Sequence, residues 1–459
     1  MRLQLKDISD SEFNTMHAAI LRLLDEFGVL FENEEARRLL ANAGNRLDEE
    51  GRIHLQPGFV ESMLKFIPTD GFTLYGRDEA KAVRVAVDHM CFRPSTGEPF
   101  LFDYETRSRR PATMEDSRTL VRVTDALEGY DMVNSVVNVD EAPGSWGNIL
   151  RFVNAHGHSL KPSDITVSTD REVRAVARIG TAIRGSEEGL REKPLTAVDV
   201  AMISPLRCTD EETRAFLECA RRGIPVEILT SPSLGVSSPL TLAGGVALTM
   251  AETVAALCLL YQVAPGLGVI NVARVSPINL RSGAYNYGAP ELGMGSVLTA
   301  ACSARYHLPT NLYGFGTAAK TFGGQAEMEK VFSGLLMALG RHHLITGAGT
   351  LDNSLITGPE LLVVDHEAIR FIKRIVQPIP IDEQAIGIDA LISEMKPGGT
   401  MMASEHTLEY MRQGAMVDCS LDQWGSLHQW EQAGQPDLLD AAHKKVKHSM
   451  QPTIHQPYS

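Results

Sequence analysis

The chain has 459 residues, of which 44% are hydrophobic and 22% charged, with a formal net charge of −14. This composition is ordinary for a globular protein, and the negative charge argues against nucleic-acid binding, which depends on clustered Lys and Arg. No apolar run reaches the roughly 20 residues that span a bilayer, and the charged N-terminus lacks a signal-peptide core, so no membrane association is expected. Six scattered cysteines without a CxxC pair favour reduced thiols in a cytoplasmic protein.

The N-terminal part, residues 1–113, predicts helices followed by a small antiparallel β unit. Apolar residues recur at mixed helical spacing between Ile8 and Phe66. The stretch 72–107 then alternates like strands, with turns marked by Pro94, Gly97 and Pro99.

Residues 114–380 alternate between strand-like and helix-like segments. The predicted strands are Met132–Val139, Ile165–Thr169, Thr196–Ile203, Val226–Thr230, Val269–Val275, Asn311–Gly314 and Leu344–Gly347, with Leu361–Val364 as the candidate for an eighth. The helix-like runs between them include 170–183, 210–222, 242–261, 291–306 and 327–339. Such alternation indicates a parallel sheet with helical crossovers and predicts a (β/α)8 TIM barrel. A doubly wound open sheet is the alternative. Residues 381–459 predict a C-terminal helical extension packed on the barrel.

In a barrel of this kind, chemistry belongs at the C-terminal ends of the strands. That rule nominates several side chains for the site, among them Asn138, Asn271, Arg274, Tyr313 and Phe315. Aromatic residues gather in two of the following loops, where Tyr285 and Tyr287 join Tyr313, Phe315 and Phe322. Aromatic faces at a strand mouth suit a quaternary ammonium group through cation–π attraction, and Arg274 suits a ligand carboxylate. Packing alone is the other explanation of these aromatics.

Two further features allow more than one interpretation. Lys320 suits a Schiff-base amine, or simply an ion pair with a loop carboxylate. His156-Gly157-His158 is typical of a metal pair in barrel hydrolases, although no full set of His and Asp ligands assembles around it.

Several segments, in order along residues 10 to 450, resemble the trimethylamine methyltransferase family of corrinoid-dependent enzymes. They are Leu74-Tyr75-Gly76-Arg77-Asp78, Ser237–Gly244, Gly288-Ala289-Pro290-Glu291-Leu292-Gly293, Leu312–Lys330 and Gly347-Ala348-Gly349-Thr350-Leu351. In the family's best-known members a pyrrolysine lies a few residues before a matching Lys. Counting back from Lys320, that position holds Gly316, so the chain is more similar to relatives without pyrrolysine, such as glycine betaine methyltransferases.

The resemblance implies an enzyme that moves a methyl group from a quaternary amine, most simply a betaine, to the Co(I) of a separate corrinoid protein. That partner carries the cobalamin, so no tightly bound metal is expected in this chain, and a homo-oligomer remains open. Tyr313, Phe315 and Tyr287 are expected around the cation. Asn271, Arg274 and Asn138 are expected at the polar end of the substrate, and Lys320 and Gln325 are expected to shape the loop. Gly316 is expected to open space for the amine or the corrin face. The alternatives are a metal-dependent barrel hydrolase using His156 and His158, and a non-catalytic betaine-binding paralogue.

Overall fold

A ring of parallel strands forms the centre of the computed structural model, which describes residues 1–139, 141–142, 144–340, 343–394, 399–418, 420–421 and 425–449. One parallel sheet has the order β13-β12-β10-β9, with bounds Val269–Ala273, Val226–Thr230, Thr196–Ala201 and Ser163–Thr166. A second has the order β14-β15-β6, with bounds Asn311–Tyr313, Leu344–Ala348 and Cys91–Pro94.

Isolated backbone pairs join the two sheets at both edges. A parallel bridge between Asn271 and Thr310 links β13 to β14. At the other edge the extended segment 131–133 lies between β6 and β9. The N–H of Asp131 donates to Phe92 O at 2.8 Å, and Val133 forms a parallel bridge with Ser163. The chain is therefore a TIM barrel with seven regular strands, and the extended segment 131–133 completes the ring between β6 and β9.

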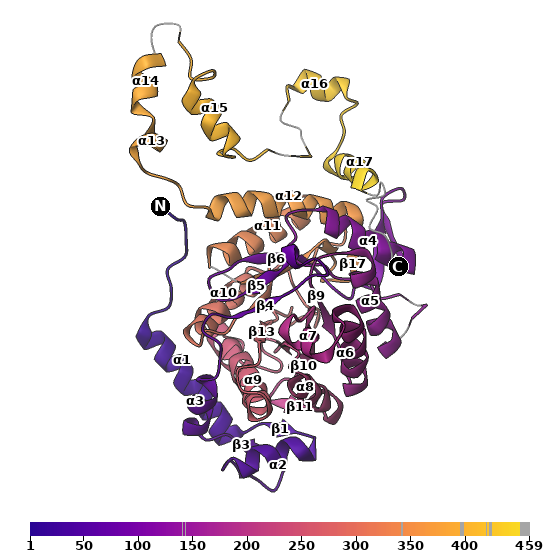
Figure 1. Cartoon of the computed structure of the whole chain (residues 1–459), viewed down its shortest axis with the longest axis vertical. Coiled ribbons are helices and arrows are strands. Elements are labelled where there is room, and N and C mark those ends of the chain that lie inside the picture. Colours follow the sequence, from indigo (N-terminus) through magenta and orange to yellow (C-terminus); the bar gives the residue numbers. More distant parts are fainter. Residues whose placement is uncertain are drawn as a thin grey trace.

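Helices follow the strands and surround the ring (Figure 1). They are α4 (Met114–Ala126), α5 (Gly144–His158), α6 (Asp170–Arg184), α7 (Glu187–Glu192), α8 (Asp210–Arg222), α9 (Leu242–Val263), α10 (Pro290–Arg305), α11 (Gly324–Leu339) and α12 (Pro359–Val376). Capping boxes at Thr113, Thr169 and Thr209 start α4, α6 and α8, because each hydroxyl accepts from a backbone N–H that has no partner within the helix.

Helix α9 is apolar on all sides and lies inside the protein. It is long and apolar enough to cross a membrane, yet 83% of its most apolar window is buried within the protein. The N-terminal helices α1 (Asp10–Arg22), α2 (Glu34–Asn42) and α3 (Pro57–Leu64) pack against it, together with the π-helical turn η1 (Leu23–Phe27). A helix covered on both faces has no need of a polar stripe.

An antiparallel hairpin closes the bottom of the ring. It consists of β4 (Phe72–Leu74) and β5 (Val83–Val85). Its apolar side chains belong to one buried cluster with inward-facing residues of the strands: Leu74, Val83, Val85, Cys91, Met132, Ala197, Ile270, Val272 and Leu344. The bottom of the barrel is thus filled with apolar side chains, which leaves the C-terminal ends of the strands for a polar site.

The remaining short elements lie around this framework. They are β1 (Leu30–Phe31) with β11 (Arg207–Cys208), β2 (Arg46–Leu47) with β3 (Ile53–His54), β7 (Phe100–Asp103) with β8 (Ser108–Pro111), β16 (Thr350–Leu351) with β17 (Ile356–Thr357), and the 3-10 turn η2 (Glu79–Lys81). The five cysteines within the described residues are buried and unpaired.

The C-terminal region leaves the barrel and returns to it. Helix α17 (Leu438–Ser449) packs against α12 and α4. Four short helices lie in sequence between α12 and α17 and contain no buried residue. They lie beyond α12 (Figure 1) and are α13 (Glu383–Ile386), α14 (Ile388–Glu394), α15 (Glu405–Arg412) and α16 (Leu427–Gln432). The division into segments 1–113, 114–380 and 381–459 stays a prediction.

The seven predicted strands all contribute to the ring, but the predicted eighth is wrong. Leu361–Val364 lies inside helix α12, and the ring position is filled by β6 from the region predicted as an antiparallel unit. A short apolar run does not by itself distinguish a strand from a buried helix.

Candidate active site at the barrel mouth

A layer of charged side chains lies inside the barrel above the apolar bottom. The buried guanidinium of Arg93 approaches Asp164 at 2.9 Å and Glu227 at 3.8 Å. Asn311 donates to Glu227 at 2.7 Å. Burial raises the pKa of Asp164 and of Glu227, and Arg93 acts in the opposite direction. These groups come from β6, β9, β12 and β14, so they tie opposite sides of the ring together.

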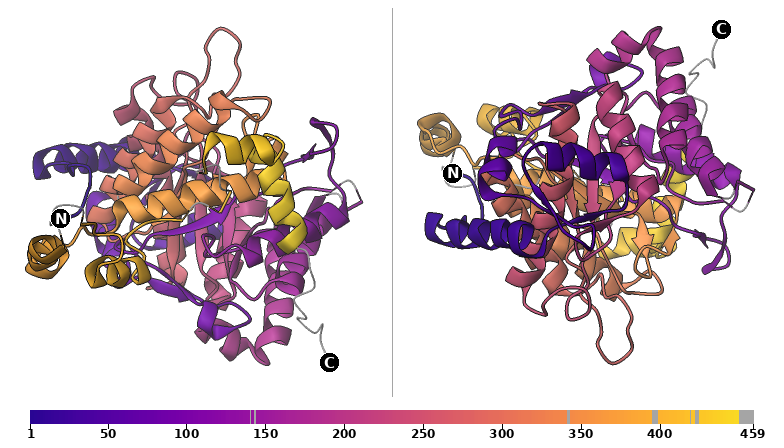
Figure 2. Two further views of the ribbon diagram at one scale, coloured as in Figure 1. Left: turned by 90° about the horizontal axis from the view of Figure 1, so that it is seen from above. Right: turned by 90° about the horizontal axis from the view of Figure 1, so that it is seen from below.

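A row of three tyrosines stands above this layer. The ring centroids of Tyr313 and Tyr287 are 5.3 Å apart, and those of Tyr287 and Tyr285 are 5.9 Å apart. Tyr313 is buried at the end of β14, whereas Tyr285 is exposed on the loop between β13 and α10, which projects from the body (Figure 2). Burial raises the pKa of Tyr313 to about 12, so its phenol stays neutral. The row runs from solvent to the interior of the mouth.

Arg274 lies beside this row as an incompletely paired cation. Its guanidinium carbon is 5.1 Å from the centroid of the Tyr313 ring. Its Nε is buried, and no described residue hydrogen-bonds to it. Alternation along β13 explains the orientation, because Ile270 and Val272 face the barrel interior and Arg274 continues the same side.

Glu98 is a mouth residue that the sequence did not reveal. Its side chain is fully buried, and neither carboxylate oxygen has a hydrogen bond of good geometry to a described residue, although Ser95 lies nearby. Burial raises the pKa of Glu98 to about 7, against the opposing effects of Ser95, Arg151 and Arg274. Glu98 follows β6, the strand missed in the sequence; only its position after that strand would have pointed to it.

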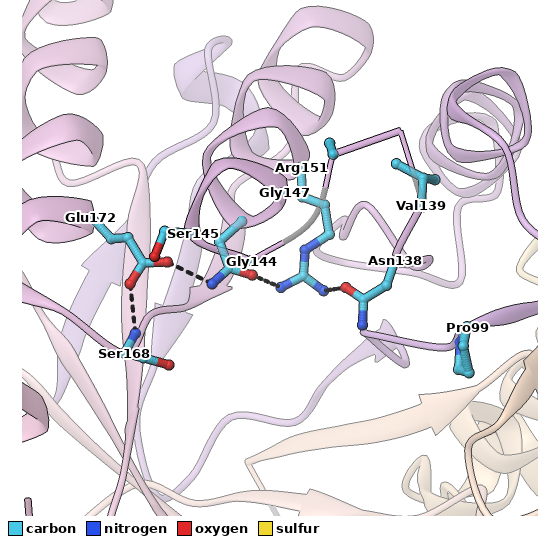
Figure 3. A pocket seen from close by; sticks show the side chains of 11 residues that line it. Pro99, Asn138, Val139, Gly144, Ser145, Gly147, Arg151, Ser168 and Glu172 are labelled. Carbon is cyan, nitrogen blue, oxygen red and sulfur yellow. Dashed lines mark hydrogen bonds between the residues drawn. The ribbon is translucent and has the colours of Figure 1, made fainter.

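A polar cavity of about 500 Å³ opens next to Glu98, lined by Pro99, Asn138, Val139, Ala142, Gly144, Ser145, Gly147, Asn148, Arg151, Ser168 and Glu172. A chain of hydrogen bonds crosses it (Figure 3). Glu172 accepts from Asn148, Asn148 accepts from Arg151, and Arg151 donates at 2.9 Å to Asn138. Asn138 thus lies beside this cavity, and its amide is already engaged by Arg151 and by Gly97 O.

Gly316 permits a close approach between the tyrosines. A Cβ at this position would lie 2.6 Å from Tyr287 O and 3.1 Å from Cδ1 of Tyr313. The space that was expected to receive the amine or the corrin face is therefore filled by Tyr287. A glycine is needed here because any side chain would displace the neighbouring backbone.

Lys320 and Gln325 lie at the rim of the mouth. Lys320 is exposed and forms an ion pair with Asp352, which matches the loop-pairing interpretation and not a buried amine. Gln325 donates to Glu329 at 2.9 Å, and Glu329 in turn accepts from Thr317 and from Ala318 N–H. Lys320 thus joins the loop after β14 to Asp352, whereas Gln325 reaches that loop only through Glu329.

Two predicted ligand groups point away from the mouth. Asn271 accepts from Thr253 of α9 and donates to Ser303 of α10, both at 2.9 Å, because neighbouring residues of β13 face opposite sides. Phe315 is fully buried in the layer under α11 and α12, where its ring meets Phe92 edge-on at 6.3 Å. Neither side chain faces Tyr287 in the way that was expected.

The histidine pair lies far from these groups. His156 is buried in the last turn of α5 and contacts Ser163 at 2.9 Å, at the start of β9 and hence at the bottom of the barrel. Burial lowers its pKa to about 3. Within the described residues, no group of three His, Cys, Asp or Glu side chains is placed to hold a metal ion.

The chain is a TIM barrel with aromatic and charged side chains at the C-terminal ends of its strands. Comparison with known proteins gives the family. The profile of trimethylamine methyltransferase (MTTB) matches residues 3–457. The chain belongs to this methyltransferase family.

The relatives are similar over nearly their whole length. Trimethylamine methyltransferase MttB of Desulfitobacterium hafniense is 26% identical over 446 residues, covering 96% of this chain and 88% of the relative. Glycine betaine methyltransferase of the same species is 25% identical over 405 residues, covering 87% of this chain and 83% of the relative.

Solved structures agree on the fold. The hydroxylamine complex of MtmB superposes with a TM-score of 0.54 at 10% identity, covering 97% of this chain and 88% of that chain. Monomethylamine methyltransferase (MtmB) of Methanosarcina barkeri gives a TM-score of 0.51 at 9% identity, covering 97% and 89%. At such identities the likeness concerns the barrel architecture alone.

Proposed function

We propose that this chain transfers a methyl group from a zwitterionic quaternary amine, such as glycine betaine, to the Co(I) of a corrinoid carried by a separate protein. The single observation that carries this proposal is the pairing of Arg274 with the tyrosine row. The guanidinium is 5.1 Å from the Tyr313 ring, and Tyr287 lies 5.3 Å from the same ring. In a ligand with both groups, the ammonium group would face the tyrosine rings and the carboxylate would face the Arg274 guanidinium.

Quaternary ammonium groups have no N–H, so hydrogen bonds cannot hold them. Aromatic faces attract them through the negative charge density of the ring, by about 0.5–2 kcal/mol per contact. The Tyr313 phenol stays neutral, since its pKa is raised to about 12, and it is fixed by Ser95 at 3.2 Å and Thr350 at 3.3 Å. A fixed ring costs little further ordering when the ligand binds.

In the transfer step the C–N bond breaks and a C–Co bond forms. The nitrogen keeps the electron pair of the C–N bond and leaves as a neutral tertiary amine, and the Co(I) electron pair forms the new bond. No proton has to move, so the site needs no general acid. What the chain supplies is alignment of the methyl group, and positioning of this kind can contribute several kcal/mol.

The partner and setting follow from the same proposal. The corrinoid protein approaches the C-terminal ends of the strands, where Tyr285 is exposed on the projecting loop. The reaction takes place in the cytoplasm, and cobalt enters with the partner as a co-substrate.

A direct test mixes the purified chain with cob(I)alamin and a panel of amines while absorbance is followed. Conversion to methylcobalamin with a betaine, and not with trimethylamine or monomethylamine, is the expected outcome. If the chain binds betaines but transfers no methyl group to free cobalamin or to a corrinoid protein, the non-catalytic paralogue would be supported instead.

A further inference from the structure

The carboxyl group of Glu98 has an unusual position in the mouth, because its backbone is held firmly while its side chain has no charged partner. Gly97 and Glu98 donate from their N–H groups to Val136 O at 2.6 and 3.2 Å, and Asn138 N–H donates to Glu98 O at 3.0 Å. The side chain is fully buried, and both oxygens lack a hydrogen bond of good geometry to the described residues. A buried carboxyl group in this state calls for a compensating partner.

The groups around Glu98 carry charge but do not contact it. Arg151 on α5 and Arg274 after β13 both act on its charge, and Glu98 acts on the phenol of Tyr313 on β14. Neither arginine comes within 4 Å of the carboxylate to form an ion pair, and Arg151 is engaged by Asn138 and Asn148. The hydroxyl of Ser95, on the same segment as Glu98, is close enough to lower the pKa of the carboxyl group by hydrogen bonding, but it is uncharged. The mouth therefore keeps opposite charges apart.

We propose that Glu98 is the counter-ion of the substrate's ammonium group, so that a zwitterionic ligand spans Glu98 and Tyr313 at its cationic end and Arg274 at its carboxylate end. This inference rests on the proposed function, which names the ligand class but assigns no negatively charged side chain to the ammonium group. Aromatic faces attract any large cation weakly, whereas a buried carboxylate distinguishes an ammonium group from a neutral group of the same shape.

A proton is coupled to this recognition. Burial raises the pKa of Glu98 to about 7, so near neutral pH the empty site is partly protonated. A bound cation favours the ionised carboxylate, and the proton then leaves to the solvent. Affinity for a permanent cation therefore rises as pH rises through 7, by about tenfold from pH 6 to pH 8.

The experiment is calorimetry of the full-length chain with two ligands of matched shape. Glycine betaine carries the quaternary nitrogen, and 3,3-dimethylbutanoate replaces that nitrogen with carbon. Titrations at pH 6, 7 and 8, in two buffers of different ionisation enthalpy, measure both affinity and proton release. In the wild type, glycine betaine should bind about tenfold more tightly at pH 8 than at pH 6 and release close to one proton at pH 6. 3,3-Dimethylbutanoate should show neither effect.

Glu98→Gln supplies the decisive comparison. The variant should bind glycine betaine at least tenfold more weakly at pH 8, without the pH dependence, while 3,3-dimethylbutanoate binds as well as to wild type or better. Retained binding of that isostere also shows that the variant is folded. Glu252→Gln is the matched control, because Glu252 is likewise a buried carboxyl group with its pKa raised by burial to about 7, but it accepts from Ser204 and Leu206 N–H. It should behave as wild type.

Unchanged affinity and pH dependence in Glu98→Gln would overturn the role of Glu98, and persisting methyl transfer would leave the proposed function standing. Absence of glycine betaine binding and of methyl transfer in the wild type would overturn both. A wild type that binds glycine betaine without releasing a proton would overturn the coupling to Glu98.

Discussion

The side-chain carbonyl of Asn353 accepts a hydrogen bond of 2.9 Å from the backbone N–H of Tyr287. Asn353 lies in a turn whose residues 352, 353 and 354 have φ values of 52°, 54° and 64°, a left-handed conformation that few side chains adopt readily. The same turn also binds the loop after β14. The N–H of Asp352 donates to Ala319 O and the N–H of Asn353 donates to Thr317 O, both at 2.8 Å. This turn thus holds two loops of the mouth together.

Replacement of Asn353 tests that role. Asn353→Ala and Asn353→Gly both remove the bond to Tyr287, but only alanine adds backbone strain, which costs about 1–2 kcal/mol in this conformation. We expect both variants to raise KM for glycine betaine several-fold, and only the alanine variant to melt at a lower temperature. An unchanged KM in the glycine variant would show that Tyr287 does not depend on Asn353.

Gly316→Ala tests the close approach of the tyrosines. The new Cβ would lie 2.6 Å from Tyr287 O, so the Tyr287 backbone must move. We expect kcat/KM to fall at least tenfold with little change in the far-UV circular dichroism spectrum. Gly324→Ala is the control, since a Cβ there meets no atom within 4 Å, and it should retain full activity. Equal activity of the two variants would refute the requirement at Gly316.

Arg274→Ala tests recognition of the carboxylate. Hydrogen bonds to a charged group contribute about 1.5–3 kcal/mol, so affinity for glycine betaine should fall about 10- to 100-fold. Tetramethylammonium, which has no carboxylate, should bind as before. Arg281→Ala, on the exposed part of the same loop, serves as the matched control. Equal losses for both ligands would contradict the role of Arg274.

The pH dependence of the free energy of unfolding tests whether His156 is buried and uncharged in the folded chain. Burial lowers its pKa in the folded state from 6.5 to about 3, so between these values only the unfolded chain binds the proton. The contribution of His156 to the free energy of unfolding is therefore complete above pH 6.5. It falls as the pH is lowered, by at most about 1.4 kcal/mol per pH unit.

In urea unfolding at pH 5 and 7.5, the wild type should lose more stability on acidification than His156→Gln does. Added Zn²⁺ should not change the melting temperature of either. Identical losses would contradict the lowered pKa of His156, and stabilisation by Zn²⁺ that depends on His156 would instead support the hydrolase alternative.

The sequence predicted most of the barrel because its strands and helices alternate with clear periods. Strand β12 and helix α8 have the predicted bounds, Val226–Thr230 and Asp210–Arg222. Strand β6 was missed because it has four residues and is followed closely by Gly97 and Pro99, which are typical of hairpin turns. That error also concealed Glu98, which lies four residues after the end of β6.

Side-chain direction limited the prediction of the site. Arg274 and Tyr313 were placed at the mouth by their positions at strand ends, and both face it. Asn271 lies on β13, three residues before Arg274, and therefore faces the opposite side. Phe315 lies beyond the end of β14, where strand alternation no longer predicts the direction of a side chain.

The most direct measurement of the central claim uses glycine betaine labelled with ¹³C in its N-methyl groups, the full-length chain and cob(I)alamin. We expect dimethylglycine and ¹³C-methylcobalamin to appear in equal amounts, and Glu98→Gln and Arg274→Ala to slow the formation of both. Dimethylglycine formed without methylcobalamin, or no demethylation by a wild type that is shown to be folded, would contradict it.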